Sequence, residues 1–161
     1  MPATPLLKLV ALDEDDLAII SAHVQDALLK IKDLTFRPAE KRFAIGLNRF
    51  AWELVAGATR KPDAQRHRAV LHFDRVLSVK AHSVPQDRPE GILSLLAVEF
   101  EKDAEPAGTI RLIFAGGAEI RLDVEVIEAQ LADLGPAWQT KAVPAHELAD
   151  QPMAASDLKP K

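Results

Sequence analysis

The amino-acid sequence predicts an α+β fold: a strongly bent, mainly antiparallel sheet of about six to seven strands, with one helix before it and one after it. Three observations lead to this prediction. Apolar residues recur at helical spacing near both ends, they alternate with polar residues through the middle, and short polar or Gly/Pro-containing segments separate the alternating stretches. Connections this short suit hairpins between antiparallel strands.

The first elements are a short strand over residues 6–12 and a helix from Glu14 to Ala27. Asp13 is a suitable N-cap, and the acids that follow it face the positive end of the helix dipole. One stripe of the helix is expected to be buried, with the residues Leu17, Ile20, Ser21, Val24 and Leu28.

Alternating strands follow. One over residues 29–36 should close in a turn at 37–40. The next carries Phe43, Ile45 and Leu47 on one face but Phe50 and Trp52 on the other. This strand is either covered on both faces or shifted by a bulge near Asn48–Arg49, and the bulge is favoured. Residues 56–65 are expected to form an exposed loop.

A long strand over residues 69–81 would place Arg75 at an inward position. After a loop at 85–91, residues 92–100 are apolar on both faces at their start, which is typical of a central strand. Residues 102–108 form the next polar turn.

The last predicted hairpin has a defined register. A loop of the three residues Ala115–Gly117 pairs Leu112 with Ile120 and keeps both apolar faces together, whereas a two-residue glycine loop would put charges into the core. We therefore expect a positive φ at Gly117, and Arg111 opposite Arg121 on the outer face. Glu119 and Asp123 on the same face, rather than a bound anion, are expected to offset these two arginines.

The chain is predicted to end in a helix and a tail. Ile127, Leu131 and Leu134 recur at helical spacing before the stop signal Gly135–Pro136. Residues 1–139 would form one domain and residues 140–161, rich in Ala, Pro and charge, a mobile tail. A bent sheet that ends in a helix is how pleckstrin-homology-like domains are built, so that architecture is the leading specific candidate.

Composition excludes several functional classes. The 161 residues contain no Cys, which rules out disulfides and thiolate chemistry. A net charge of −4 does not favour nucleic-acid binding, and no apolar run approaches the roughly 20 residues that span a bilayer. With no secretory signal visible, a cytoplasmic location is expected. No cofactor motif, metal-ligand spacing or catalytic constellation is present, so no catalytic residue is assigned.

The basic charge is concentrated in the middle of the chain. Residues 30–88 hold thirteen Lys and Arg against six Asp and Glu, an excess of +7. Pairing across neighbouring strands would explain this excess without a ligand. The functional alternative is a basic face for an anionic or acidic partner, formed by Arg60, Lys61, Arg66, His67 and Arg68.

Arg49 and Arg75 both fall at inward positions, where an unpaired charge is costly. Each is either in a structural ion pair, with Asp74 or Glu53 as the nearby candidates, or part of an anion site that would include His72.

Several blocks of the chain together resemble a known family. These blocks are residues 7–13 and 20–23, 48–50, 71–76, 114–118 and 129–138. They are similar, over residues 6–148, to a family of uncharacterised bacterial proteins known as a domain of unknown function. The resemblance implies a small cytoplasmic bacterial protein and carries over no activity or site residue.

Two functional hypotheses result. The first is a non-enzymatic binding or adaptor domain for a protein or anionic partner. The alternative is a phosphate- or carboxylate-binding protein or small enzyme, with a pocket near Arg49, His72 and Arg75. A homodimer through an exposed edge strand is compatible with either.

Overall fold

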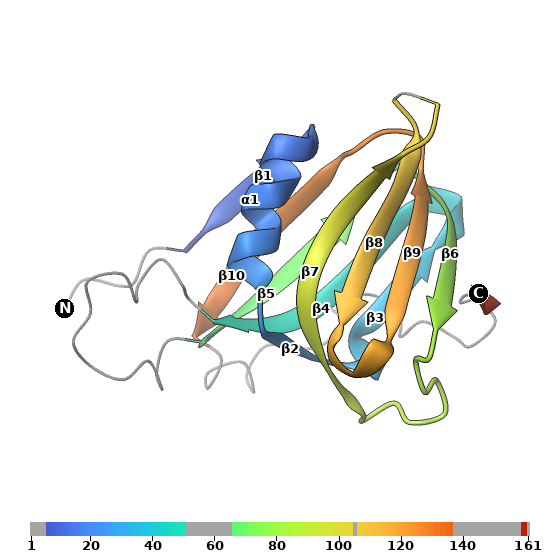
Figure 1. The fold of residues 1–161 in the computed structure, drawn as a ribbon. Helices are drawn as coiled ribbons and strands as arrows, with labels where there is room; N and C mark the ends of the chain where they lie inside the picture. Colours follow the sequence, from blue (N-terminus) through green and yellow to red (C-terminus); the bar gives the residue numbers. More distant parts are fainter. Residues whose placement is uncertain (1–5, 51–65, 105, 137–158, 161) are drawn as a thin grey trace.

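The computed structural model describes residues 6–50, 66–104, 106–136 and 159–160, and these residues form a mostly antiparallel sheet with one α-helix (Figure 1). The elements of the first half are β1 (Lys8–Ala11), α1 (Glu14–Val24), β2 (Ala27–Lys30), β3 (Leu34–Arg37), β4 (Arg42–Phe50) and β5 (Arg66–Phe73). Those of the second half are β6 (Val76–His82), β7 (Ile92–Lys102), β8 (Gly108–Phe114), β9 (Glu119–Val124), β10 (Ala129–Pro136) and β11 (Lys159–Pro160).

The sheet is larger than predicted and folds over on itself. It has 11 strands in the order β1-β10-β5-β4-β2-β7-β8-β9-β6-β11, with β3 also paired to β4. β2 pairs with β4 on one side and with β7 on the other, so the sheet bends there into two layers. Figure 1 shows β7, β8, β9 and β6 in front of β1, β10, β5 and β4. The apolar residues between the layers form a single core that includes Phe43, Phe73 and Phe114.

The predicted C-terminal helix is wrong, and with it the pleckstrin-homology-like architecture. Residues 129–136 form β10, which pairs with β1 and β5. The inward residues alternate as Ile127, Ala129, Leu131 and Asp133, and all four are buried. Because Asp133 is charged, this alternation was hidden in the sequence, and Leu134, which completed the apparent helical stripe, is exposed.

The predicted long strand over residues 69–81 is two strands joined by a tight turn. Arg75 lies in this turn with a φ of 63°, and it is exposed. The inward phase assigned to Arg75 is therefore wrong. The alternation of buried and exposed side chains shifts by one residue at this turn, so that Val76 is buried and Leu77 is exposed.

The bulge predicted near Asn48–Arg49 is also wrong. The β4–β5 pairing runs without a shift from Phe43 opposite Phe73 to Phe50 opposite Arg66. Arg49 points inward and Phe50 outward, where its ring lies 5.7 Å from the Arg66 guanidinium carbon. Both outer-face residues Ala44 and Gly46 are buried, as in a strand covered on two faces. Trp52 and the predicted loop at 56–65 lie outside the described residues.

The three-residue hairpin is confirmed. Leu112 lies opposite Ile120, Ile110 opposite Leu122 and Arg111 opposite Arg121. Gly116 and Gly117 have φ values of 82° and 88°, which residues with a Cβ adopt only with strain.

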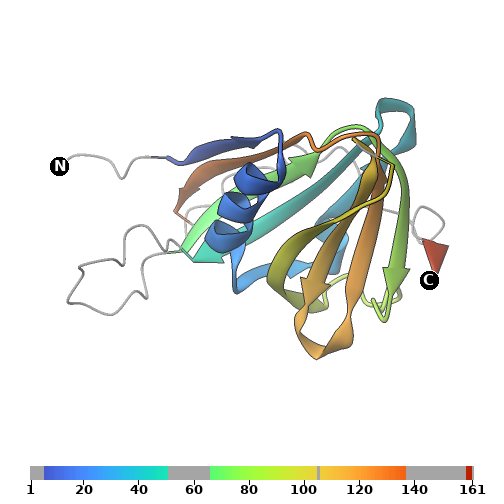
Figure 2. The same cartoon turned by 45° about the horizontal axis from the view of Figure 1, so that its top comes forward.

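Helix α1 forms where the sequence predicts it, and it ends earlier, at Val24. The Asp13 side chain accepts a hydrogen bond from the Asp16 amide at 2.8 Å. Leu17, Ile20 and Val24 are buried, and Ser21 Oγ accepts a hydrogen bond from the Val98 amide at 2.8 Å. Figure 2 shows α1 beside β7 and against the layer that contains β1 and β10.

The predicted tail lies largely outside the described residues, within which Lys159–Pro160 pairs in parallel with Lys80–Ala81 of β6. Among the described elements, no helix is long and apolar enough to cross a membrane.

Candidate functional site

Two features at opposite ends of the β1–β10 pair are candidates for a functional site. At one end, a buried cluster of charged side chains joins β4, β5 and β10. Arg49 Nε and Nη2 each donate to one oxygen of the Asp133 carboxylate at 2.7 Å. His67 Nδ1 lies 3.0 Å from Asp133 Oδ2, and the Leu7 amide donates to the same oxygen at 2.9 Å. The side chains of Arg49 and Asp133 are fully buried.

Two opposing effects act on the pKa of Asp133. Burial alone raises it, but the hydrogen bonds from Arg49, His67 and the Leu7 amide outweigh burial and hold the pKa of the Asp133 carboxyl below its ordinary value. The carboxylate is therefore charged and bound to Arg49 through both oxygens. Arg49 is in an internal ion pair, as one of the two interpretations of the sequence proposed. Its partner Asp133 was not among the predicted candidates, and the candidate Glu53 lies outside the described residues.

The structure does not bring Arg49, His72 and Arg75 together. Arg49 faces the core at one end of β4, whereas His72 lies on the outer face of β5 and Arg75 in the turn beyond β5. Arg75 is within 3.6 Å of Glu128 and 3.9 Å of Glu125. Burial, assisted by the nearby positive charge of Arg42, lowers the pKa of His72.

The predicted basic face is only partly within the described residues, because Arg60 and Lys61 lie outside them. The other three side chains do not share a face. His67 points into the core, while Arg66 and Arg68 point outward. Arg68 pairs with Asp33 at 3.3 Å, and Arg66 Nη1 donates to the Asn48 carbonyl oxygen at 3.4 Å.

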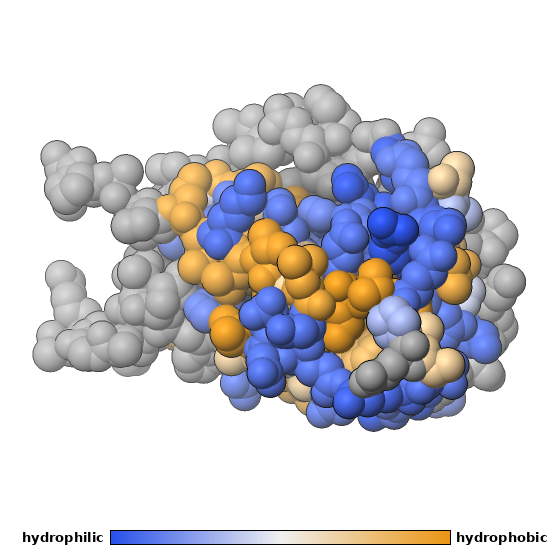
Figure 3. All heavy atoms as spheres, turned by 90° about the horizontal axis from the view of Figure 1, so that it is seen from above, coloured by the Kyte–Doolittle hydropathy of each residue, from blue (hydrophilic) through white to orange (hydrophobic). Residues whose placement is uncertain are grey.

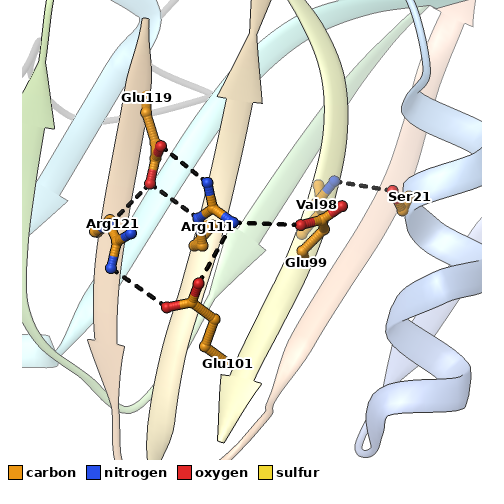
Figure 4. A network of polar contacts seen from close by, with 7 residues as sticks. All are labelled: Ser21, Val98, Glu99, Glu101, Arg111, Glu119 and Arg121. Atoms are coloured by element: carbon orange, nitrogen blue, oxygen red, sulfur yellow. Dashed lines mark hydrogen bonds and ion pairs between the residues drawn. The ribbon is translucent and has the colours of Figure 1, made fainter.

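Internal carboxylates also offset the Arg111–Arg121 pair (Figure 4). Glu119 accepts hydrogen bonds from both guanidinium groups at 2.8–3.1 Å, and Glu101 lies within 3.4 Å of both. Asp123, the second predicted partner, instead accepts hydrogen bonds from Ser78 and Thr109. Glu119 was thus correctly predicted as a partner, whereas Glu101 was not foreseen.

At the other end of the β1–β10 pair, loops from three parts of the chain surround a groove of about 250 Å³. We call this the apolar groove, and it is lined by Leu12, Asp13, Glu14, Phe100, Pro106, Val126 and Ile127. Figure 3 views the molecule from this end and shows apolar surface between hydrophilic margins. These residues come from the β1–α1 junction with the first residue of α1, from the end of β7 with the β7–β8 turn, and from the β9–β10 connection.

The margin of the apolar groove is mostly acidic. Asp13 and Glu14 line it, and both are exposed. Asp13 also caps α1, and Glu14 lies 3.6 Å from Lys102. Asp15 follows Glu14 and Asp103 follows Lys102 in the chain, and both are exposed, so four of the five described charged residues named here are carboxylates. Such a site suits an apolar group that carries a positive charge next to it.

Sequence reasoning placed Arg49 inward and offered an ion pair as one interpretation, but it missed the partner Asp133 and the whole of the groove. Asp133 was assigned to a predicted helix. The only signal for its inward position is that it continues the alternation of Ile127, Ala129 and Leu131, and its charge conceals that signal. The groove joins residues as distant in sequence as Leu12 and Val126, and no local pattern marks such a site. Across residues 6–50, 66–104 and 106–136, no group of three or more His, Asp or Glu side chains is arranged to hold a metal ion.

Comparison with known proteins gives one match. A family described as "Protein of unknown function (DUF2948)" matches residues 7–146. This agrees with the resemblance found in the sequence. No curated protein and no solved structure matches the chain.

Proposed function

Because the chain belongs to the DUF2948 family, whose function is unknown, we propose a function from its own geometry: a non-enzymatic binding domain that recognises a protein partner through the apolar groove. The occupant is an apolar side chain in a basic segment of that partner. A cytoplasmic location, expected from the sequence, is part of this proposal.

The groove's size and lining carry the proposal. Pockets for small molecules usually measure roughly 300–1,000 Å³ and enclose most of the ligand. The apolar groove is smaller, about 250 Å³, and open to solvent. Leu12 and Pro106 are exposed beside it, and Phe100 and Val126 are half-buried. It therefore suits one or two side chains of a longer molecule that lies across the surface.

Charge identifies the class of partner. An acidic margin attracts Lys and Arg and disfavours carboxylates and phosphates, because like charges across an interface are costly. The anionic-partner form of the binding hypothesis has less support. Arg49, Arg68, Arg111 and Arg121 already bind carboxylates of the same chain, which leaves these cations engaged.

A peptide experiment tests this proposal. A displayed library of short peptides, each with a central leucine or phenylalanine, is selected on the full chain, and the affinity of the selected peptides is measured by calorimetry. We expect selection of lysine and arginine beside the apolar residue. Val126→Glu should weaken binding at least about tenfold, because it places a charge in the groove.

Two controls accompany this experiment. Ile92→Glu changes an exposed apolar residue of β7 outside the groove and should leave the affinity unchanged. Asp13→Asn combined with Glu14→Gln keeps a good N-cap while removing two charges, so it should weaken the binding of basic peptides. It should lower the free energy of unfolding by no more than about 1–2 kcal/mol, the contribution of two charges at a helix N-terminus, and leave the protein folded. Selection of acidic peptides, or equal effects of Val126→Glu and Ile92→Glu, would refute the proposal.

A further inference from the structure

The β1 strand lies at an edge of the sheet. It pairs with β10 from Lys8 opposite Ala132 to Ala11 opposite Ala129, and no strand among the described residues pairs with its other side. Figures 1 and 2 show β1 at the margin of its layer. An open edge of this kind can pair with another strand.

The backbone geometry shows which groups this edge offers. The Asp133 amide donates to the Leu7 carbonyl oxygen at 2.9 Å, so the polar backbone groups of Leu7 point toward β10. Because these directions alternate along a strand, Leu9 and Ala11 also point toward β10. The N–H and C=O groups of Lys8 and Val10 therefore point away from the sheet.

Apolar side chains accompany this open edge. Leu6 is 56% exposed and Val10 is 52% exposed, although both lie on or beside the strand. Ile19 of α1 is 50% exposed. It lies roughly 160° around the helix from Ser21, which contacts β7, so it faces the flank of α1 away from β7.

From these observations we propose that two copies of the chain associate by antiparallel pairing of β1 with β1 of the second copy, around a two-fold axis at Leu9. In this register Lys8 of each copy lies opposite Val10 of the other. These two residues exchange about four backbone hydrogen bonds across the axis. This proposal rests on the open edge of β1, whereas the binding proposal rests on the residues that line the apolar groove.

The charge on the edge and the extent of β1 favour this register, because an axis at Val10 would place Lys8 opposite Leu12, which lies beyond the end of β1. An axis at Lys8 would place the two Lys8 ammonium groups opposite each other, which is unfavourable. An axis at Leu9 instead places each Lys8 stem beside an exposed valine, with the ammonium group free to reach water. The same strand is thus complementary to itself in one antiparallel register, which favours a second copy over an unrelated strand as the occupant.

The dimer is expected to be weak. Two strands as short as β1 bury less than the roughly 1,200–2,000 Å² of a standard interface. The association should therefore depend on protein concentration over the micromolar to millimolar range.

Sedimentation of the full chain tests the proposal. We expect the average mass to rise toward that of a dimer with concentration. Val10→Pro removes an outward N–H while leaving the bonds to β10 in place, and it should raise the dissociation constant at least tenfold. Val10→Lys, opposite Lys8, should do the same, whereas Val10→Glu should keep the dimer in a salt-sensitive form.

Crosslinking tests the register independently. The chain has no Cys, so Leu9→Cys introduces a single thiol at the proposed axis, where opposed Cα atoms are close enough for a disulfide. Lys8→Cys is the matched control, because its thiols would lie out of register. Rapid oxidative dimerisation of Leu9→Cys alone is expected. A monomer at millimolar concentration, a dimer unaffected by Val10→Pro, or equal crosslinking of both variants would overturn the proposal.

Discussion

The Asp133 carboxylate connects β4, β5 and the segment before β1. These parts belong to the layer that contains β1, β10, β5 and β4. It binds Arg49 of β4 through two oxygens, lies beside His67 of β5, and accepts a hydrogen bond from the amide of Leu7 before β1. A buried guanidinium without its carboxylate is far less stable than the pair. These contacts fix the end of the layer, and we regard their role as structural.

Asp133→Asn should therefore destabilise the protein strongly. The substitution keeps the side chain's shape but takes from the buried Arg49 the carboxylate that it binds through two hydrogen bonds. We expect the free energy of unfolding in urea to fall by about 3–5 kcal/mol. Replacing both partners, with Arg49→Met and Asp133→Leu, should lower the free energy of unfolding less than Asp133→Asn alone does. A loss below about 1 kcal/mol for Asp133→Asn would contradict this account.

The lowered pKa of His72 predicts a dependence of stability on pH. Burial disfavours the charged imidazole in the folded state, so the unfolded chain binds more protons as the pH falls below the ordinary value of 6.5. The free energy of unfolding should therefore fall as the pH is lowered from 7 toward the folded pKa of His72.

His72→Gln should flatten this part of the profile of stability against pH, measured by urea unfolding at a series of pH values. His82→Gln, at an exposed position on β6, is the matched control and should leave the slope in place. An unchanged slope in His72→Gln would remove His72 as its cause.

Among the elements, β7 and β8 are packed unusually closely beside the apolar groove. A Cβ on Gly108 would lie less than 3.0 Å from the Phe100 ring and from the Glu101 carbonyl oxygen. Phe100 also lines the groove. Close packing in this hairpin therefore determines the shape of the groove.

Gly108→Ala should both destabilise the protein and alter the groove. We expect a loss of about 1–3 kcal/mol in urea unfolding, typical of overpacking, together with weaker binding of the basic peptides. Adding Phe100→Leu should recover part of the stability, because the smaller side chain leaves room for the methyl group. Strictly additive effects of the two changes would show that the predicted clash with the Phe100 ring does not form.

The elements that the sequence predicted correctly are those with strong local signals. The acidic N-cap located α1, and apolar pairing selected the Ala115–Gly117 loop among the alternatives. β10 was mistaken for a helix because a buried charge occupied an inward position that an apolar residue usually holds. The turn at Arg75 was missed because no glycine or proline marks it, although the backbone there is left-handed.

For the molecule as a whole, the number and order of strands could not be read from local patterns. β10 inserts between β1 and β5, which are distant from it in sequence, and β2 pairs with two strands at the bend. Such long-range pairing depends on complementary faces across the whole chain. The apolar groove arises only after three distant segments meet, so the site could be predicted no better than the topology.

Mapping of backbone amide shifts by NMR during titration with a selected basic peptide tests the central claim most directly. The account predicts saturable shifts centred on Leu12, Phe100, Val126 and Ile127, which line the apolar groove, with no comparable response to a peptide whose basic residues are replaced by glutamate. Shifts centred instead on the outer faces of β4 and β5, or an equal response to the acidic peptide, would contradict it.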